Sequence, residues 1–240
     1  MISQDAITKF ADRYQTTELT IRREYLQHLF LSYFYKQGNT DNIYFKGGTA
    51  LRFIYKSPRF SEDLDFSSSL KEVETIEQIM ISTFAQIDHE GIQVEIEEVK
   101  KTTGGYLAIL HLKTDSTIIP IQLEISLRGE ELKGETTAIV SDLFPTYTVI
   151  QLQKRQIVDG KIAALLSRKK PRDFYDLYFM LRAGLLSIEQ KNLLFQALEA
   201  LRQSSNLNFE QELKRFLPKS HWPIIRELPQ ALEGEIQRFL

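Results

Sequence analysis

The segment 45–66 reads FKGGTALRFIYKSPRFSEDLDF and constrains the fold more than any other part of the chain. Its pattern predicts a short strand at 43–45, a glycine turn, and a helix over 49–56 that stops at a Ser-Pro pair. Asp63 and Asp65 then alternate with apolar residues, so on a strand both carboxylates occupy one face. The chain is therefore expected to contain a strand–turn–helix–strand unit with an acidic surface.

The glycine turn and the two aspartates each allow a chemical and an ordinary interpretation. Gly47 and Gly48 let a ligand approach the backbone, and Thr49 either caps the following helix or binds a phosphate oxygen. A D-x-D pattern aims two carboxylates at one point, where divalent metals that promote phosphoryl or nucleotidyl transfer bind. The ordinary alternatives are a plain strand-to-helix turn and a solvated strand face.

A third carboxylate occurs on a later predicted strand, residues 118–127. The apolar residues of this strand alternate onto one face, which leaves Glu124 on the other. Glu124 could complete a triad with Asp63 and Asp65, either as a metal ligand or as the general base for an incoming hydroxyl. An exposed strand glutamate explains the same pattern equally well.

Outside these segments the pattern is helical, then mixed, then helical. Helices are predicted over residues 2–14, 18–36, 73–87, 152–167, 172–183, 187–202, 208–216 and 223–239, and further strands over 92–99 and 106–113. The run Thr102-Thr103-Gly104-Gly105 predicts a hairpin turn between the last two. Two capping boxes are predicted, namely Ser69 with Glu72 and Ser187 with Gln190. The predicted parts are N-terminal helices (1–40) that pack on a core (41–150), followed by a C-terminal helical domain (151–240).

The composition excludes several classes of protein. Hydrophobic residues (42%) and charged residues (26%) are in the usual proportions of a globular protein, and no apolar run approaches the roughly 18 residues of a membrane helix. The first ten residues lack the features of a signal peptide, and the absence of cysteine excludes disulfides, so a cytoplasmic location is expected. The net charge of −2 limits any nucleic-acid contact to a local basic patch.

Two segments together resemble the AbiEii/AbiGii nucleotidyltransferase toxin family, which belongs to the DNA polymerase β-like nucleotidyltransferase superfamily. The family pattern is K-G-G-T-x-L followed by R-x-S-x-D-L-D, and it matches this chain at Lys46, Gly47, Gly48, Thr49, Leu51, Arg59, Ser61, Asp63, Leu64 and Asp65. A second segment, KIAALLSRKKPRDFYDLYFML, is similar to the family's K-x-x-A-L-x-x-R-x-x-x-R-D-x-x-D-L, with matches at Lys161, Arg168, Arg172, Asp173 and Asp176. The two motifs span residues 45–182 in the expected order.

The resemblance implies an α+β fold, with a polymerase β-like nucleotidyltransferase core (a mixed sheet with helices) and helical N-terminal and C-terminal parts. It implies transfer of a nucleoside monophosphate from a nucleoside triphosphate with Mg²⁺ or Mn²⁺ as cofactor. It also implies RNA as acceptor, with tRNA favoured, and an antitoxin protein as partner.

The resemblance also assigns roles to residues. The implied catalytic set is Asp63, Asp65, Glu124 and Lys161, of which the three carboxylates would bind metal. The implied nucleotide-binding set is Lys46, Gly47, Gly48, Thr49, Arg59, Ser61, Asp173 and Asp176, in which Arg59 and Ser61 either brace the loop before the aspartates or contact phosphate. Many relatives have an aspartate as third carboxylate, so Glu124 is a departure from the family pattern.

The second motif also has ordinary explanations. Lys161 lies beside an apolar helical stripe and could snorkel to solvent instead of reaching the triphosphate. Asp173 near Pro171 suits the first turn of a helix through its dipole, an explanation that covers Asp176 less well. The densest basic cluster provides candidate RNA contacts, although such a run is usually a solvated loop. Its members are Arg168, Lys169, Lys170 and Arg172.

The sequence therefore predicts a nucleotidyltransferase, with two alternatives left open. In one, the enzyme class is the same but the acceptor is a small molecule, such as an aminoglycoside, or a protein side chain. In the other, the chain is a non-catalytic module that binds nucleotides and regulates a partner.

Overall fold

The computed structural model describes residues 2–102, 104–114, 117–129, 131–204 and 206–240. The chain divides into two units. The first, here called the sheet unit, comprises Met1–Lys56 and Phe60–Gln153. The second, the helical unit, comprises Lys154–Leu240 together with the short segment Ser57–Arg59. None of the described helices is both long and apolar enough to cross a membrane.

A seven-stranded mixed sheet forms the centre of the sheet unit within the described residues, with the strand order β3-β4-β5-β2-β1-β7-β6. β2 runs parallel to β5, and β1 runs parallel to β7, whereas the other neighbouring pairs are antiparallel. The strands are β1 (Ile43–Lys46), β2 (Leu64–Ser68), β3 (Gln93–Thr102), β4 (Gly105–Thr114), β5 (Thr117–Ser126), β6 (Gly134–Ile139) and β7 (Tyr147–Leu152).

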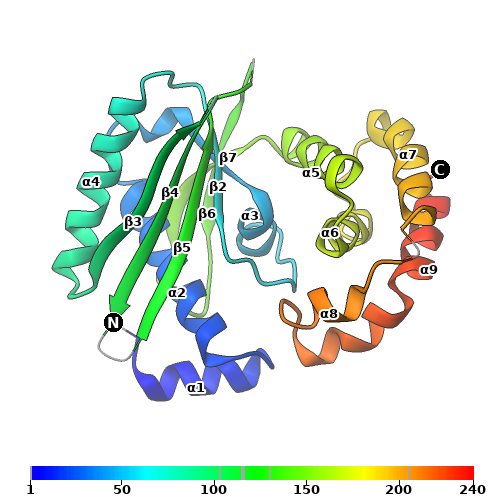
Figure 1. Ribbon diagram of the computed structural model, residues 1–240, viewed down its shortest axis with the longest axis horizontal. Coiled ribbons are helices and arrows are strands. Elements are labelled where there is room, and N and C mark those ends of the chain that lie inside the picture. The colour runs from blue at the N-terminus through cyan, green and yellow to red at the C-terminus, as the bar shows by residue number, and fades with distance from the viewer. Residues whose placement is uncertain (1, 103, 115–116, 130, 205) are drawn as a thin grey trace. The chain divides into compact units, whose positions relative to one another are not determined.

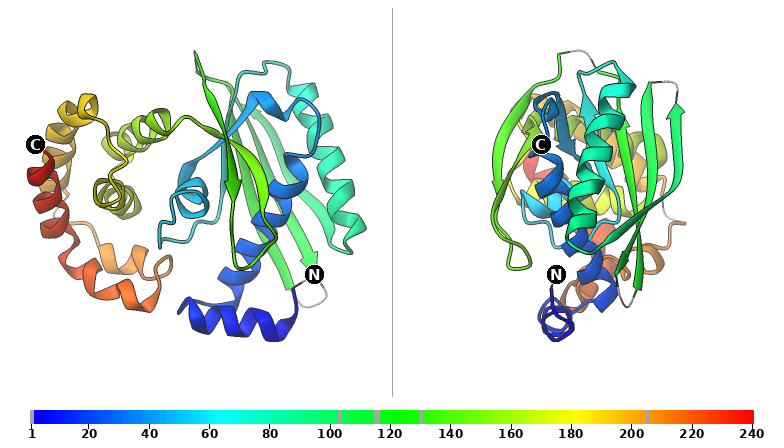
Figure 2. Two further views of the ribbon diagram at one scale, coloured as in Figure 1. Left: turned by 180° about the vertical axis from the view of Figure 1, so that it is seen from behind. Right: turned by 90° about the vertical axis from the view of Figure 1, so that its left-hand side faces the viewer.

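Helices α2 (Glu18–Phe34) and α4 (Val73–His89) cover one face of this sheet, as Figures 1 and 2 show. The side chains that alternate toward them, such as Phe66 and Leu123, are fully buried in one hydrophobic core. Burial of this face is the main source of stability of the unit, because the transfer of apolar surface from water drives folding. The polar residues Lys46, Asp65, Gln122 and Glu124 alternate with the buried residues and lie on the opposite face, here called the polar face.

Two further helices complete the sheet unit. α1 (Gln4–Arg13) precedes α2 and starts from the N-cap residue Ser3, whose side chain accepts a hydrogen bond from the N–H of Ala6 at 3.2 Å. α3 (Gly47–Phe53) follows β1 directly and lies beside β1 and β2. The ring of Phe53 near its end stacks on His28 of α2 with a centroid distance of 3.8 Å. α3 therefore contacts both the sheet and the long helix α2.

The helical unit is built around α6. Its members are α5 (Lys154–Arg168), α6 (Pro171–Arg182), α7 (Lys191–Arg202), α8 (Phe209–Leu213) and α9 (Trp222–Phe239). α6 contacts α5, α8 and α9, and its apolar residues, including Phe174 and Met180, are fully buried. These helices confirm the predicted helical pattern of the C-terminal part.

The structure confirms the predicted mixed sheet with helices and corrects three details. β6 and β7 were not predicted, and the helix expected from residue 152 begins at Lys154 because β7 occupies the residues up to Leu152. The capping box of Ser69 with Glu72 is wrong, since Glu72 is itself the N-cap residue of α4.

Two predicted turns can also be compared with the structure. The box at Ser187 is present in part, because the Gln190 side chain accepts a hydrogen bond from the Ser187 N–H at 2.9 Å, but it caps a short 3₁₀ turn ahead of α7. In the predicted hairpin turn, Thr103 lies outside the described residues, while the flanking strands β3 and β4 pair antiparallel as expected.

Candidate active site

Three charged residues form a row across the polar face of the sheet. Lys46 on β1 pairs with Asp65 on β2, and Asp65 pairs in turn with Glu124 on the parallel strand β5. Residues paired in this way have their Cβ atoms roughly 5 Å apart and point to the same face. Asp65 is half-buried and Glu124 is exposed. The register therefore brings together two carboxylates that are far apart in the sequence.

Asp63 lies immediately before β2, two positions from Asp65. Its backbone carbonyl oxygen accepts a hydrogen bond from the hydroxyl of Thr49 at 2.5 Å, and Thr49 is 1% exposed. This bond joins the first turn of α3 to the segment that enters β2. Thr49 is not the cap of α3, whose N-cap residue is Lys46. The threonine hydroxyl thus positions the backbone that carries the first aspartate.

Gly47 connects the glycine turn with the second aspartate. Its φ angle is +84°, in the left-handed region that favours glycine. A Cβ atom at this position would come within 2.7 Å of both the Cβ and the Cγ of Asp65. Only a residue without a side chain leaves room for the carboxylate there. The structure therefore brings Gly47 of the glycine turn and Asp65 of the D-x-D together.

The loop before Asp63 is held by a residue that sequence reasoning missed. Gln27 on α2 is 1% exposed, and its Nε2 donates to the backbone oxygens of Ser61 at 3.1 Å and Glu62 at 2.9 Å. The Glu62 side chain also pairs with Arg23 at 2.7 Å. Nothing in the sequence near Gln27 marks it, because its partners are backbone atoms more than thirty residues away.

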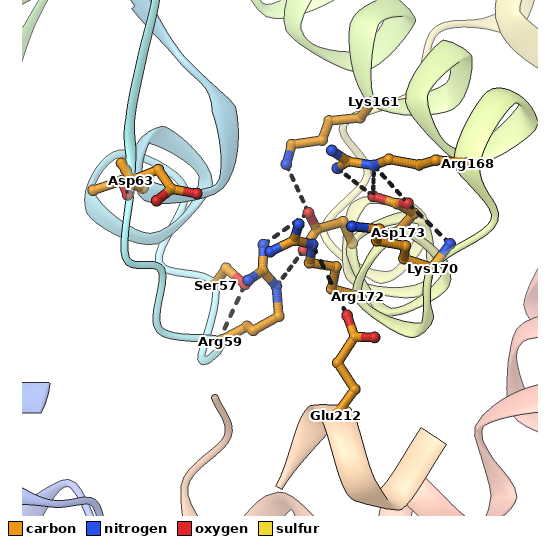
Figure 3. A network of polar contacts seen from close by, with 11 residues as sticks. Ser57, Arg59, Asp63, Lys161, Arg168, Lys170, Arg172, Asp173 and Glu212 are labelled. Carbon is orange, nitrogen blue, oxygen red and sulfur yellow. Dashed lines mark hydrogen bonds and ion pairs between the residues drawn. The ribbon is translucent and has the colours of Figure 1, made fainter. Parts of the chain in front are cut away.

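Asp176 binds two cations in the helical unit, Arg59 and Lys161, both of which are labelled in Figure 3. Its carboxylate accepts hydrogen bonds from Arg59 at 2.7 and 2.9 Å and from Lys161 at 2.7 Å. Asp176 and Arg59 are almost completely buried, and Lys161 is 11% exposed. Burial by itself raises the pKa of Asp176, but the charges of Arg59 and Lys161 outweigh it and lower this pKa to about 2. The carboxylate is therefore ionised at neutral pH, and one buried carboxylate faces two cations.

Asp173 has a different environment in the same helix. It accepts hydrogen bonds from the N–H of Lys170 at 3.2 Å and from Arg168 at 2.6 to 3.1 Å, and it is buried. This is the geometry of a capping side chain at the start of α6, where Pro171 is the first residue. Asp173 therefore stabilises the first turn of the helix and holds Arg168 in place.

Three of the four side chains in the basic cluster at the start of α6 contact polar partners within the helical unit. Arg168 pairs with Asp173, and Lys169 donates to the side chain of Gln203 at 3.0 Å. Arg172 lies 3.9 Å from Glu212. Lys170 is exposed.

The predicted site residues thus fall into two groups, each described within its own unit. Those of the sheet unit are Lys46, Gly47, Gly48, Thr49, Ser61, Asp63, Asp65 and Glu124. Those of the helical unit are Arg59, Lys161, Arg168, Lys169, Lys170, Arg172, Asp173 and Asp176.

The carboxylates of the sheet unit suit a metal ion whose coordination is completed by the substrate. No group of three or more His, Asp or Glu side chains is gathered into a metal site among the described residues. Mg²⁺, however, is commonly held by only one or two carboxylates together with water and substrate phosphates. The paired Asp65 and Glu124, with Asp63 beside them in the sequence, provide such a donor set.

Comparisons with known proteins agree with this arrangement. A family model for the nucleotidyl transferase AbiEii toxin of type IV toxin–antitoxin systems matches residues 29–239. The fold is similar to the crystal structure of a candidate nucleotidyltransferase from Helicobacter pylori, with a TM-score of 0.67, 19% identity, and coverage of 93% of this chain and 95% of that chain. It is also similar to JHP933 from Helicobacter pylori, with a TM-score of 0.66, 19% identity and coverage of 93% of each chain. No curated protein matches the chain. The two structures establish the fold, and the family match over most of the sequence shows that the chain belongs to the AbiEii family of nucleotidyltransferase toxins.

Proposed function

We propose that this nucleotidyltransferase moves a nucleoside monophosphate from a nucleoside triphosphate to RNA, with tRNA as the favoured acceptor. We further propose that it acts as the toxin of a pair whose antitoxin protein restrains it. The catalytic part of this proposal rests on the pairing of Asp65 with Glu124, next to Gly47. This pairing supports a site in which carboxylates, a lysine and a close-packed glycine turn lie on one polar face.

The reaction is a single displacement at phosphorus. A hydroxyl oxygen of the acceptor forms a bond to the α-phosphorus, the bond from that phosphorus to the bridging oxygen of the β-phosphate breaks, and pyrophosphate leaves with that electron pair. Glu124, which is exposed at the end of the carboxylate row, is proposed to accept the proton of the attacking hydroxyl. Bound Mg²⁺ or Mn²⁺, held by Asp63 and Asp65, would neutralise phosphate charge and align the oxygens. If Glu124 is instead a third ligand of the metal, the proton would pass to another acceptor.

The remaining residues are proposed to bind or position the nucleotide. Lys46 lies beside Asp65 in register and would offset negative charge of the triphosphate, close to the backbone of Gly47 and Gly48. Thr49 and Ser61 would act indirectly, by holding the segment that carries Asp63. The Thr49 hydroxyl donates to the carbonyl oxygen of Asp63, and the Ser61 carbonyl oxygen accepts from Gln27 of α2.

The helical unit supplies residues whose roles follow from the family resemblance. Lys161 is proposed to contact the triphosphate, with Asp176 and Arg59 fixing its position through the buried ion cluster. Asp173 is proposed to act by holding the start of α6. Arg168, Lys169, Lys170 and Arg172 are retained as candidate contacts for the RNA backbone, and Arg168 and Lys170 are the exposed pair among residues 168–170.

The test is a labelling assay in which each of the four α-³²P-labelled NTPs is incubated with the protein and cellular RNA in the presence of Mg²⁺. We expect label to appear in an RNA band with one or more NTPs, and to disappear in the Asp63→Asn variant. If the label appears on a small molecule or on protein instead of RNA, the proposed RNA acceptor is wrong and the labelled molecule is the acceptor. Absence of any NTP turnover with all acceptors would contradict the catalytic proposal and favour a binding module.

A further inference from the structure

A small pocket of about 290 Å³ lies over the end of the β3–β4 hairpin and reaches Glu124. Its lining includes Gly104, Gly105, Leu107, Gln122, Glu124 and Arg128. All of these residues belong to the sheet unit. The pocket therefore has a candidate catalytic carboxylate in its wall.

The strand register explains why the pocket has a polar wall. Gln122 and Glu124 alternate with the buried residues of β5 and so project from the same face. Leu107 on β4 is paired directly with Glu124 and adds an apolar surface next to the carboxylate. The pocket thus combines a carboxylate, an amide and an aliphatic side chain over a short length of sheet.

Arg128 provides the positive charge of the pocket, and Gly104 makes room for it. Gly104 has a φ of +93°, and a Cβ atom there would come within 2.5 Å of the Nε and 2.7 Å of the Cγ of Arg128. The arginine side chain therefore lies directly over the hairpin end. The N–H of Leu127 donates to the carbonyl of Gly104 at 2.9 Å, which fixes the segment that carries Arg128 against the hairpin.

A second cation lies close to the same segment. The Nζ of Lys71 donates to the carbonyl oxygen of Leu127, the residue before Arg128, at 3.0 Å. Lys71 is exposed. Two cations, Lys71 and Arg128, therefore lie at the segment that follows β5, a few residues after Glu124.

We propose that this pocket receives the terminal nucleotide of the acceptor RNA, with its hydroxyl toward Glu124 and a phosphate against Arg128. This inference rests on the proposed function of the carboxylate row. One carboxylate accepts a hydrogen bond from a hydroxyl, and one guanidinium binds a single phosphate through its planar fork of donors. In the proposed function the triphosphate is bound at Lys46 and the backbone of Gly47 and Gly48, none of which lines this pocket.

The size of the pocket agrees with a single nucleotide as occupant. Its volume of about 290 Å³ lies just below the range of roughly 300–1,000 Å³ found for drug-sized ligand sites. Leu107 offers apolar surface to a sugar or base, and Gln122 offers both a donor and an acceptor. The rest of the acceptor would then lie outside the pocket.

The decisive experiment measures Arg128→Ala in the full-length protein. The rate of label transfer is recorded at saturating NTP while the concentration of unfractionated tRNA is varied, and then at saturating tRNA while NTP is varied. We expect the KM for tRNA to rise by about tenfold or more, because a charge-assisted contact to phosphate is lost. The KM for NTP should stay within about twofold, and Arg128→Lys should lie between wild type and alanine because it keeps the charge without the fork.

The matched control is Arg13→Ala. Arg13 is an exposed arginine of the sheet unit that pairs with Asp142 on the surface. It should leave both KM values unchanged. A thermal melt of each variant establishes that the proteins compared are folded.

Two results would overturn the pocket assignment. If Arg128→Ala leaves the KM for tRNA unchanged while the wild-type protein labels tRNA, the pocket is not the acceptor site. If the KM for NTP rises instead, the pocket serves the donor nucleotide. In both cases the proposed transfer to RNA still stands, whereas a wild-type protein that labels no RNA would remove the proposed function and this inference together.

Discussion

Asp65 and Glu124 occupy paired positions on the parallel strands β2 and β5, although they are 59 positions apart in the chain (124 − 65). Parallel neighbours of this kind need a long crossover connection, which here includes α4 and the β3–β4 hairpin. Their side chains share the polar face, and the buried residues on either side of them fix the register. The carboxylate pair is therefore maintained by the hydrophobic core behind it.

Removal of one charge from this pair should abolish catalysis without unfolding the protein. We expect Asp65→Asn to lower the rate of NMP transfer by at least about a hundredfold, because a preorganised electrostatic contact in an active site is worth that much. The thermal midpoint should change little, since the substitution keeps the shape of the side chain. Glu98→Gln, on the exposed strand β3, is the matched control and should transfer at the wild-type rate. Equal activity of Asp65→Asn and wild type would contradict the assigned role.

The contact between Gly47 and Asp65 predicts that the glycine cannot be replaced. Gly47→Ala should destabilise the fold by roughly 1–3 kcal/mol, because alanine is strained at positive φ and its Cβ would overlap the aspartate. Activity should fall further than stability, since Asp65 must move. Chemical denaturation and the labelling assay measure the two effects.

Gly160 provides the comparison for this substitution. It lies inside α5 and is exposed, and a Cβ atom added there would meet no neighbouring heavy atom within 4 Å. Gly160→Ala should therefore stabilise the helix by up to about 1 kcal/mol. If both alanine variants behave alike, the special requirement at Gly47 is refuted.

Because His28 is buried in its neutral form, we expect the folded protein to lose stability in mild acid. Burial, followed by the charges of Lys56 and Arg52, lowers the pKa of His28 to about 3. The unfolded chain binds a proton at this residue near pH 6.5, whereas the folded chain does not, so stability is complete above pH 6.5 and falls as the pH decreases toward 3. The slope from this residue alone approaches about 1.4 kcal/mol per pH unit well below pH 6.5.

His28→Gln is the variant that isolates this effect. It keeps a polar group near the hydroxyl of Tyr147, which lies 2.8 Å from the Nδ1 of His28. The variant should be less stable at pH 7.5, but its free energy of unfolding should change less between pH 7.5 and 5 than that of the wild type. Parallel pH profiles for the two proteins would show that His28 is not the titrating group.

The ion cluster around Asp176 predicts a large cost for removing its charge. Asp176→Asn leaves Arg59 and Lys161 without their shared counter-charge in a buried environment, which should cost roughly 3–5 kcal/mol of stability. Asp5→Asn removes an aspartate whose pair with Lys9 is exposed and should change stability by less than about 0.5 kcal/mol. Urea denaturation of the two variants tests the difference, and similar midpoints would contradict it.

The local parts of the site could be predicted from the sequence, because each depends on nearby residues. The strand β1, the helix after the double glycine and the alternation around Asp65 all follow from short-range periodicity and turn chemistry. The position of Glu124 on the polar face of β5 follows from the same alternation. The family resemblance then predicted the enzyme class that the comparison confirmed.

Other features depend on contacts between distant parts of the chain and were not predictable in this way. No local pattern indicates that Asp65 is paired with Glu124, or that Asp176 binds Arg59 across 117 residues. Gln27 carries no sequence signal because it acts on backbone oxygens. The strand β7 does have a sequence signal, because its run of Thr, Val and Ile favours a strand. The run is short, however, and leads directly into the stronger helical pattern of α5.

The assignment of Ser57–Arg59 to the helical unit has a consequence for how such a protein can evolve. The chain enters that unit, returns to the sheet, and enters again at Lys154, so a break after Gln153 would separate Arg59 from the carboxylate of Asp176. Each fragment would inherit one half of a buried ion pair. Recombination or gene fission at the apparent boundary is therefore disfavoured, and the two units are expected to be inherited together as one piece.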